Sequence, residues 1–323
     1  MNILLSMPND QQTNNYLVNA LTDMGHFVFY CDHRRHLKEC MQFVPQILKA
    51  EKIDLMLVAY FKNGETYPKE YIDKLKASSP NTIFCSWIFD ATVDNKICNE
   101  NNDFVNLMKV YDFFFTVCRG QVKSFREQGV NAFFVQEGVD KFIRDLSGEY
   151  EQDIDVSFIG QVGHPMVHQD RLALLKKICM RFDKTKIYGP LYVNDDIISA
   201  YHTRRPTFND IEHSIVVAKS KINISNSGWP EIDGYFSART YRLMGSGGFV
   251  LANKTNNIEE FFVPDKEIVL YSNTQECVEK ILYYLDHEEE RVAIAEAGKK
   301  RTMSKYTFNH SLEKIINIIN NRW

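Results

Sequence analysis

The segment Gly228 to Ala252 reads GWPEIDGYFSARTYRLMGSGGFVLA. This pattern predicts a loop, then a short helix that Ser237 can cap, and then a buried strand over Phe249–Ala252. Glycines that allow a tight passage separate the helix from the strand, at Gly245, Gly247 and Gly248. A helix that leads through a glycine break into an apolar strand is typical of an α/β fold.

Outward from this segment, the first half of the chain alternates strand and helix patterns. Between the apolar runs lie segments whose apolar residues have helical spacing, as in Asn14–Met24 and Leu37–Ala50. Such strands, separated by helices, predict a parallel sheet with helices on both faces. The predicted strands are Ile3–Ser6, Phe27–Cys31, Leu55–Ala59, Thr82–Trp87, Phe113–Val117 and Ala132–Gln136.

The pattern restarts after a polar, acidic stretch at Ser147–Asp155, which we interpret as a linker. A chain of 323 residues favours two domains over one core. We therefore predict Rossmann-like domains over residues 1–150 and 151–323, facing a central cleft. In the second domain we predict strands at Val156–Ile159, Lys186–Tyr188, Ile222–Ile224 and Ile268–Tyr271, and helices at Val167–Met180, Asp210–Lys219, Glu288–Lys300 and Phe308–Asn320.

The composition excludes or disfavours several classes of protein. A net charge of −4 makes duplex nucleic acid an unlikely partner. The seven scattered cysteines form no C-x-x-C pair and indicate reduced thiols in a cytoplasmic enzyme. No apolar run approaches the ~20 residues that span a bilayer. The nine histidines show no metal-binding spacing, and neither a G-x-S-x-G elbow nor a P-loop is present.

The helix after Ser237 places positive charge near its own beginning. Arg239 and Arg242 stand three residues apart and so occupy neighbouring positions. Helix N-termini attract anions, and the guanidinium fork suits phosphate oxygens. The segment therefore predicts a site for a phosphate-bearing ligand, over which the loop Gly228–Gly234 can close. The other interpretation is a surface helix whose arginines pair with nearby acids.

Ligands of open α/β sheets bind outside the carboxyl ends of the strands, so residues just after strands are the next candidates. Gly160 follows a strand and precedes a helix, where glycine permits a close approach of a ligand; a plain strand-to-helix turn explains it equally well. Arg171 lies in that helix, where a solvated surface arginine is the simpler interpretation. Tyr188 ends another strand and joins these candidates.

In the first domain, Asp90 ends the buried run Ser86–Asp90 at the carboxyl edge of the sheet. A carboxylate there can act as general base toward a sugar or another hydroxyl. A carboxylate that caps the next loop explains the same position. Trp87 could stack on a ligand ring, although a core role is more common.

Six segments, spread over nearly the whole chain, carry a family resemblance. They are Trp87–Asp90, Tyr111–Thr116, Glu137–Asp140, Asp155–Gly160, Ser237–Arg242 running into Gly247 and Gly248, and Lys280–Tyr306. In order and spacing they resemble glycosyltransferases of the GT-B architecture, in particular the CgeB-type family named for spore maturation proteins.

The resemblance implies a hexosyltransferase-like enzyme that moves a sugar from a nucleotide-sugar donor to an acceptor, without a bound metal or other cofactor. The first domain would hold the acceptor, a glycan, protein or small molecule, and the C-terminal helices would pack across the two domains. The second domain would hold the nucleotide sugar through Gly160, Arg171, Tyr188, Gly234, Ser237, Arg239, Arg242 and Gly247.

One position departs from the family pattern. Related enzymes often carry a glutamate in the donor-site helix that bonds the ribose, and the corresponding residue here is Arg242. The arginine shifts recognition toward the diphosphate or marks an unusual donor. Two alternative functions stay open, a nucleotide-sugar epimerase-like enzyme on the same scaffold and a non-catalytic sugar-nucleotide binding protein.

Overall fold

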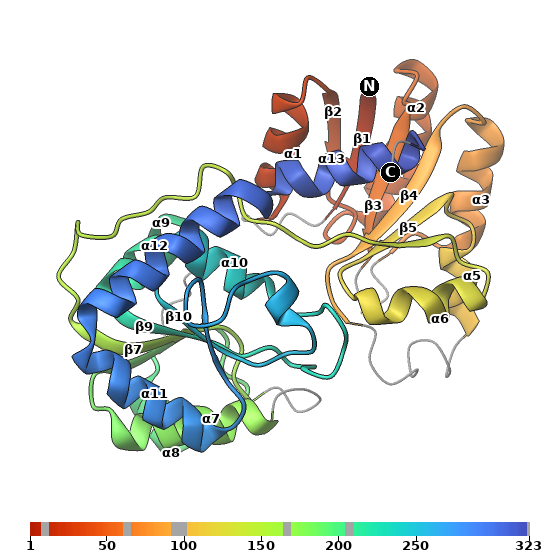
Figure 1. Cartoon of the computed structure of the whole chain (residues 1–323). Helices are drawn as coiled ribbons and strands as arrows, with labels where there is room; N and C mark the ends of the chain where they lie inside the picture. The colour runs from red at the N-terminus through yellow and green to blue at the C-terminus, as the bar shows by residue number, and fades with distance from the viewer. Residues whose placement is uncertain (8–12, 61–65, 92–101, 164–168, 204–209, 322–323) are drawn as a thin grey trace. The chain divides into compact units, whose positions relative to one another are not determined.

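The computed structural model describes residues 1–7, 13–60, 66–91, 102–163, 169–203 and 210–321. The chain divides into two compact units, each built on a parallel sheet (Figure 1). Met1–Gly138, Ile232–Tyr235 and Phe308–Trp323 form the first unit, and Val139–Glu231 and Phe236–Thr307 form the second. The two sheets confirm the α/β class and the alternation of strands and helices that the sequence predicts.

The first unit holds a six-stranded sheet with the order β2-β1-β3-β4-β5-β6, in which neighbouring strands are parallel. Its strands are β1 (Asn2–Ser6), β2 (Phe27–Cys31), β3 (Leu55–Tyr60), β4 (Ile83–Ile88), β5 (Phe113–Thr116) and β6 (Ala132–Phe134). Its helices are α1 (Thr13–Asp23), α2 (Leu37–Ala50), α3 (Lys69–Ser78), α5 (Asn102–Met108), α6 (Val122–Glu127) and α13 (Phe308–Ile319), with a 3-10 turn at Arg119–Gln121.

The strands of the first sheet are apolar almost throughout because helices bury both faces. In β4, Phe84 and Ile88 join a cluster with side chains of α2, α3 and α6. Cys85 and Trp87 face the other way and join a cluster with α1 and α13. Trp87 is fully buried there, which confirms its core role and excludes stacking on a ligand.

The last helix returns to the first unit after the second unit is complete. Figure 1 shows α13 running beside α1, and the rings of Tyr16 and Phe308 stack with centroids 6.1 Å apart. Leu312 and Ile315 of α13 are buried in the same cluster as Trp87. This burial ties the C-terminal residues to the first sheet.

The second unit holds a five-stranded parallel sheet with the order β11-β10-β9-β7-β8. Its strands are β7 (Ile154–Ile159), β8 (Thr185–Tyr188), β9 (Ser220–Ser225), β10 (Val250–Asn253) and β11 (Val269–Tyr271). Its helices are α7 (Gln169–Arg181), α8 (Asp196–Tyr201), α9 (Asp210–Lys219), α10 (Ala238–Gly245), α11 (Thr274–Asp286) and α12 (Glu288–Lys305), with a 3-10 turn at Ile258–Glu260.

The division of the chain differs from a single boundary at residue 150. Residues 139–150 belong to the second unit because they bond to α12 and the residues after it. The Val139 amide donates to the Tyr306 carbonyl oxygen at 2.9 Å, and Lys299 Nζ lies 2.6 Å from Asp145 Oδ2. Residues 308–323 belong to the first unit, as the burial of α13 explains.

Most predicted elements agree with the observed ones within a few residues. The helix expected from Val167 is α7, but Val167 itself lies outside the described residues. The short helix α8 was not predicted, because its six residues are too few to show a period. Within the described part of the chain, no helix is both long and apolar enough to cross a membrane.

Candidate functional site

The central strands of the second sheet end together at the point where the strand order reverses. β7 pairs with β8 on one side and with β9 on the other, so the chain leaves β7 in one direction and later returns on the opposite side. Ligands of open parallel sheets bind at such a switch point. β7 ends at Ile159 and β9 at Ser225, so the loops that begin with Gly160 and Asn226 form this edge.

Arg171 and Arg239 converge on the loop after β9. Arg171 donates from Nη2 to the carbonyl oxygen of Asn226 at 2.6 Å and from Nε to its Oδ1 at 3.1 Å. Arg239 donates from Nη1 to the same carbonyl oxygen at 3.1 Å. Both guanidinium groups also lie over the Phe158 ring, 5.4 and 4.8 Å from its centroid. The oxygens of Asn226 are neutral, and these bonds orient the two guanidinium groups.

The burial of Arg171 corrects one interpretation of the sequence. The residue is only 3% exposed, so it is not a solvated surface arginine. Its third bond, from Nη1 to the Gln161 carbonyl oxygen at 2.9 Å, fastens it to the loop after β7. Arg171 therefore links the two loops of the switch point.

Gly160 provides the space in which the Arg239 guanidinium lies. Arg239 Nε donates to the Ile159 carbonyl oxygen at 2.5 Å, and a Cβ on Gly160 would collide with the guanidinium. The Gly160 amide donates to the Tyr188 carbonyl oxygen at 2.8 Å. A plain turn does not require this glycine, but the approach of Arg239 does. The structure thus brings Gly160, Tyr188 and Arg239 together.

Helix α10 begins beside this arginine pair. Ser237 is its N-cap, with Oγ accepting from the Arg239 amide at 3.4 Å, as the sequence predicts. Its own amide donates to Ser227 Oγ at 2.9 Å. The first turn of α10 contains no acidic residue, and Arg239 stands in it instead. A cation at the positive end of a helix is unfavourable in isolation, so this arrangement favours a bound anion.

Arg242 lies one turn further along α10 and is half-buried. Its positive charge acts on the imidazole of His213 in α9, a residue that is 1% exposed. Burial, followed by the positive charges of Arg242 and Arg239, holds the pKa of His213 well below its usual value. His213 is therefore neutral near physiological pH.

Gly247 lies at the opposite end of α10 from Ser237. The helix has eight residues, so its two ends are about 12 Å apart. Gly247 has a left-handed φ of 81°, and a Cβ there would collide with Asp145 and Ser147. Its role is to end the helix against the segment that opens the second unit.

In the first unit, Asp90 follows β4 and is exposed. Its Oδ1 accepts from the Ala91 amide at 3.0 Å and from the Tyr235 hydroxyl at 3.3 Å. Asp90 thus caps the next loop, which agrees with the interpretation as a capping carboxylate. It also stands at the carboxyl edge of the sheet, as the interpretation as a general base requires. Burial and then the charge of Asp90 raise the pKa of Tyr235 well above its usual value.

Gly234 belongs to the first unit and not to the second. It lies in Ile232–Tyr235, which we call the docked segment because the residues on both sides of it belong to the second unit. The Gly234 carbonyl oxygen accepts from Gln136 Nε2 at 2.5 Å. Its φ of 68° is left-handed, and a Cβ would press against Arg119. Gly234 therefore shapes the loop before α10 and is placed with the first unit.

Sequence reasoning missed Asn226, although its oxygens hold both arginines. Asn226 directly follows β9, so the rule that selected Asp90 and Gly160 would have selected it. Asn253, at the end of β10, was missed in the same way. Its Oδ1 accepts from the Ser227 amide at 2.7 Å and so fixes the residue that bonds Ser237.

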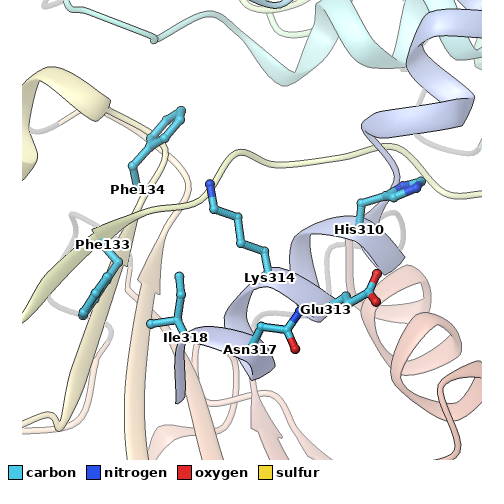
Figure 2. Close-up of a pocket in the computed structure, with 7 residues that line it drawn as sticks. All are labelled: Phe133, Phe134, His310, Glu313, Lys314, Asn317 and Ile318. Atoms are coloured by element: carbon cyan, nitrogen blue, oxygen red, sulfur yellow. The ribbon is translucent and has the colours of Figure 1, made fainter. Parts of the chain in front are cut away.

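A cavity of about 380 Å³ lies between β6 and α13 of the first unit (Figure 2). Lys314 extends from α13 toward Phe134, with Nζ 5.2 Å from the ring centroid. Burial lowers the pKa of Lys314. The cavity is within the size range of small-molecule sites. It is lined by Phe133, Phe134, His310, Glu313, Lys314, Asn317 and Ile318.

Several solved structures share this architecture over nearly their whole length. The structure of Alr3699/HepE from Anabaena in complex with UDP is 12% identical, with 99% of this chain and 100% of that chain covered and a TM-score of 0.67. Sucrose-phosphate synthase from Thermosynechococcus elongatus is 10% identical, with 100% of each chain covered and a TM-score of 0.68. A proposed UDP-N-acetylglucosamine 2-epimerase from Listeria monocytogenes is 14% identical, with 99% and 96% covered and a TM-score of 0.60. At these identities the likeness establishes the fold, which is that of GT-B glycosyltransferases.

Residues 170–317, just under half of the chain, match the model of the family described as glycosyl transferase-like. The matched segment contains Arg171, Ser237, Arg239 and Arg242. No curated protein matches the chain. The chain therefore has a GT-B glycosyltransferase fold, and most of its second unit carries a glycosyl transferase-like sequence.

Proposed function

We propose that this protein is a glycosyltransferase that moves a hexose from a nucleotide-sugar donor to an acceptor. The observation that carries the proposal is the pairing of Arg171 and Arg239 on the neutral oxygens of Asn226, beside the N-terminus of α10. Positive charge collected at a strand switch point suits the diphosphate of a nucleotide sugar.

Each residue of this cluster has a proposed part in the reaction. Arg239 and the first amides of α10 bind the diphosphate, and Arg171 supports them from the loop after β7. Their charge stabilises the nucleoside diphosphate as the sugar leaves it, which is where negative charge develops. Gly160 and Tyr188 form the backbone against which the donor rests, and Arg242 is a second phosphate ligand in place of a ribose-binding glutamate.

Related structures support the choice of donor. Alr3699/HepE is described in complexes with UDP, with UDP and glucose, and with UDP-glucose. We therefore propose a uridine diphosphate sugar as the first donor to test. We further propose kinship with the CgeB-type family, for which the six resembling segments are the support.

For the acceptor we propose the first unit, with Asp90 as general base. Its exposed carboxylate at the carboxyl edge is within reach of solvent and so of an incoming hydroxyl group. The cavity beside α13 is lined by both aromatic and polar side chains, which suit a sugar residue of an acceptor glycan. Acceptor proteins and small molecules are the other candidates.

We propose that the reaction needs no metal, because the arginine pair and the helix N-terminus supply the charge that a metal supplies elsewhere. We also propose a cytoplasmic location. The six cysteines among the described residues carry free thiols, and five of them are buried, as expected where disulfides do not form.

The test has a binding step and a turnover step. UDP should raise the thermal unfolding temperature of the protein, since a ligand that binds only the native state stabilises it. UDP-glucose and other nucleotide sugars should then be converted to UDP, slowly with water as acceptor, and the rate should survive EDTA. Complete loss with EDTA, restored by magnesium, would contradict the metal-independent proposal.

The main alternative is an epimerase, which the likeness to the Listeria structure favours. An epimerase converts the nucleotide sugar into its epimer with no acceptor, and this product is visible by NMR. A non-catalytic binding protein would show the thermal shift with UDP but neither product. Release of UDP and free sugar is the outcome that supports a transferase.

A further inference from the structure

The docked segment Ile232–Tyr235 is held by the first unit through a two-point ion pair. Arg119 donates from Nε to Asp233 Oδ2 at 2.8 Å and from Nη2 to Oδ1 at 2.6 Å. The Gly120 amide also donates to the Asp233 carbonyl oxygen at 3.0 Å. A bidentate arginine–carboxylate pair fixes orientation as well as distance.

The ion pair is better suited to positioning than to stabilising the fold. Both side chains are about 30% exposed, Arg119 at 31% and Asp233 at 30%. Partly exposed pairs of this kind contribute little to the free energy of unfolding. The geometry of the pair is nevertheless specific, so its main effect is on where the following residues lie.

Tyr235 is the residue that this anchoring places. It is 6% exposed, and its hydroxyl lies 3.3 Å from Asp90 Oδ1. Since its pKa is raised, the hydroxyl keeps its proton and donates to the carboxylate. The Ala91 amide donates to the same oxygen. Two bonds to one oxygen select a single orientation for an exposed side chain that could otherwise rotate.

We propose that Tyr235 is a positioning residue for Asp90 and that the Arg119–Asp233 pair seats Tyr235 for this task. The inference rests on the proposed function, in which Asp90 is the general base. Ser237, the cap of α10, follows Tyr235 by two residues in the chain.

The test uses the full chain and the nucleotide sugar that the unmodified protein turns over fastest, beginning with UDP-glucose. Tyr235→Phe keeps the ring and removes only the hydroxyl. Because hydrogen bonds to charged groups are worth about 1.5–3 kcal/mol, kcat should fall about 10- to 100-fold. KM for the nucleotide sugar and the affinity for UDP should change less than about twofold, since neither depends on Asp90.

A second variant removes one charge of the Arg119–Asp233 ion pair and leaves Tyr235 and Asp90 unchanged. Asp233→Asn should lower kcat by a smaller factor, leave the thermal unfolding temperature nearly unchanged, and again spare KM. The matched control is Tyr283→Phe. Tyr283 also donates to a carboxylate, Glu290 Oε1 at 2.9 Å, but on the outer helices of the second unit. This control should turn over at the rate of the unmodified protein.

Each outcome decides the proposal. An unchanged kcat in Tyr235→Phe overturns it, and so does a fall in kcat that comes with an equal rise in KM or with lost thermal stability. If the unmodified protein turns over no nucleotide sugar, the proposed function fails before any variant is made, and the inference fails with it. The two failures are thus separate observations.

Discussion

In each unit, the strand that comes first in the chain lies between the strands that come second and third. The residues at the ends of these two first strands differ. β1 lies between β2 and β3, and β7 lies between β8 and β9. β1 ends at Ser6, whose Oγ bonds His33 Nδ1 at 3.0 Å and the Tyr67 hydroxyl at 2.9 Å, all three being fully buried. β7 is followed by Gly160, which has no side chain, and an arginine lies against it.

The difference shows how one architecture serves two purposes. In the first unit, hydroxyls and an imidazole fill the end of β1, and the functional candidate is the exposed carboxylate of Asp90, which follows β4. In the second unit, the guanidinium groups of Arg171 and Arg239 lie at the end of β7. The proposed sugar transfer needs both a base and an anion site, and in that proposal each sheet supplies one of them.

The largest expected effect comes from removing the base. Asp90→Asn keeps the shape of the side chain and its bond from the Ala91 amide, but it cannot take up a proton. We expect the rate of transfer to fall about 10²- to 10⁴-fold, as for general bases elsewhere. Binding of UDP, measured by calorimetry, should be unchanged. A variant that loses UDP binding instead would place Asp90 with the donor site and break the comparison.

Arg239→Ala should have the next largest effect, now on the other sheet. We expect the rate to fall about 10²- to 10³-fold, because a donor to the developing charge is lost. UDP binding should weaken as well, which distinguishes this variant from Asp90→Asn. The matched control is Arg126→Ala. Arg126 Nε also donates to a backbone carbonyl oxygen, that of Ala132, and its guanidinium also lies over a phenylalanine ring, but in the first unit.

Replacement by alanine should affect two glycines of the second unit differently, lowering the rate at Gly160 and the stability at Gly247. Gly160→Ala pushes the Arg239 guanidinium aside, and misplacement by about 1 Å can cost up to about 10²-fold in rate. Gly247→Ala forces alanine to a φ of 81° against Asp145, which should cost about 1–3 kcal/mol of stability without changing the rate. Urea denaturation and UDP release measure the two effects. A slow but stable Gly247→Ala would support the predicted place of Gly247 in the donor site.

Much of this arrangement could be predicted from the sequence because it is local. Strand ends, the Ser237 cap and the arginines of α10 follow from periodicity and residue type over a few positions. The partner of Arg171 could not be predicted, because Asn226 is 55 residues away and meets it only in the folded sheet. For the same reason the grouping of Gly234 with the first unit and of residues 139–150 with the second could not be predicted. Their neighbours, Gln136 and Lys299, are 98 and 154 residues distant from Gly234 and Asp145.

The smallest effect concerns the contact of α12 with Asp145, at the end of α10 remote from Arg239. Burial raises the pKa of Asp145, but the Lys299 ammonium and hydrogen bonds from Ser147 outweigh it and leave the pKa below its usual value. The carboxylate therefore stabilises the fold above the pKa of the unfolded chain, about 3.9, and this contribution is lost as the pH falls through the lowered folded value.

Asp145→Asn should accordingly reduce the free energy of unfolding by no more than about 1 kcal/mol near neutral pH, since the pair is partly exposed. The difference from the unmodified protein should shrink as urea denaturation is repeated from pH about 7 down to about 3, because the unfolded chain of the unmodified protein takes up a proton at Asp145 over this range. Turnover should not change, since α10 is touched only at the end remote from Arg239. A difference that grows in acid would mean that Asp145 is protonated in the folded state, and a loss of turnover would show that this end of α10 also shapes the donor site.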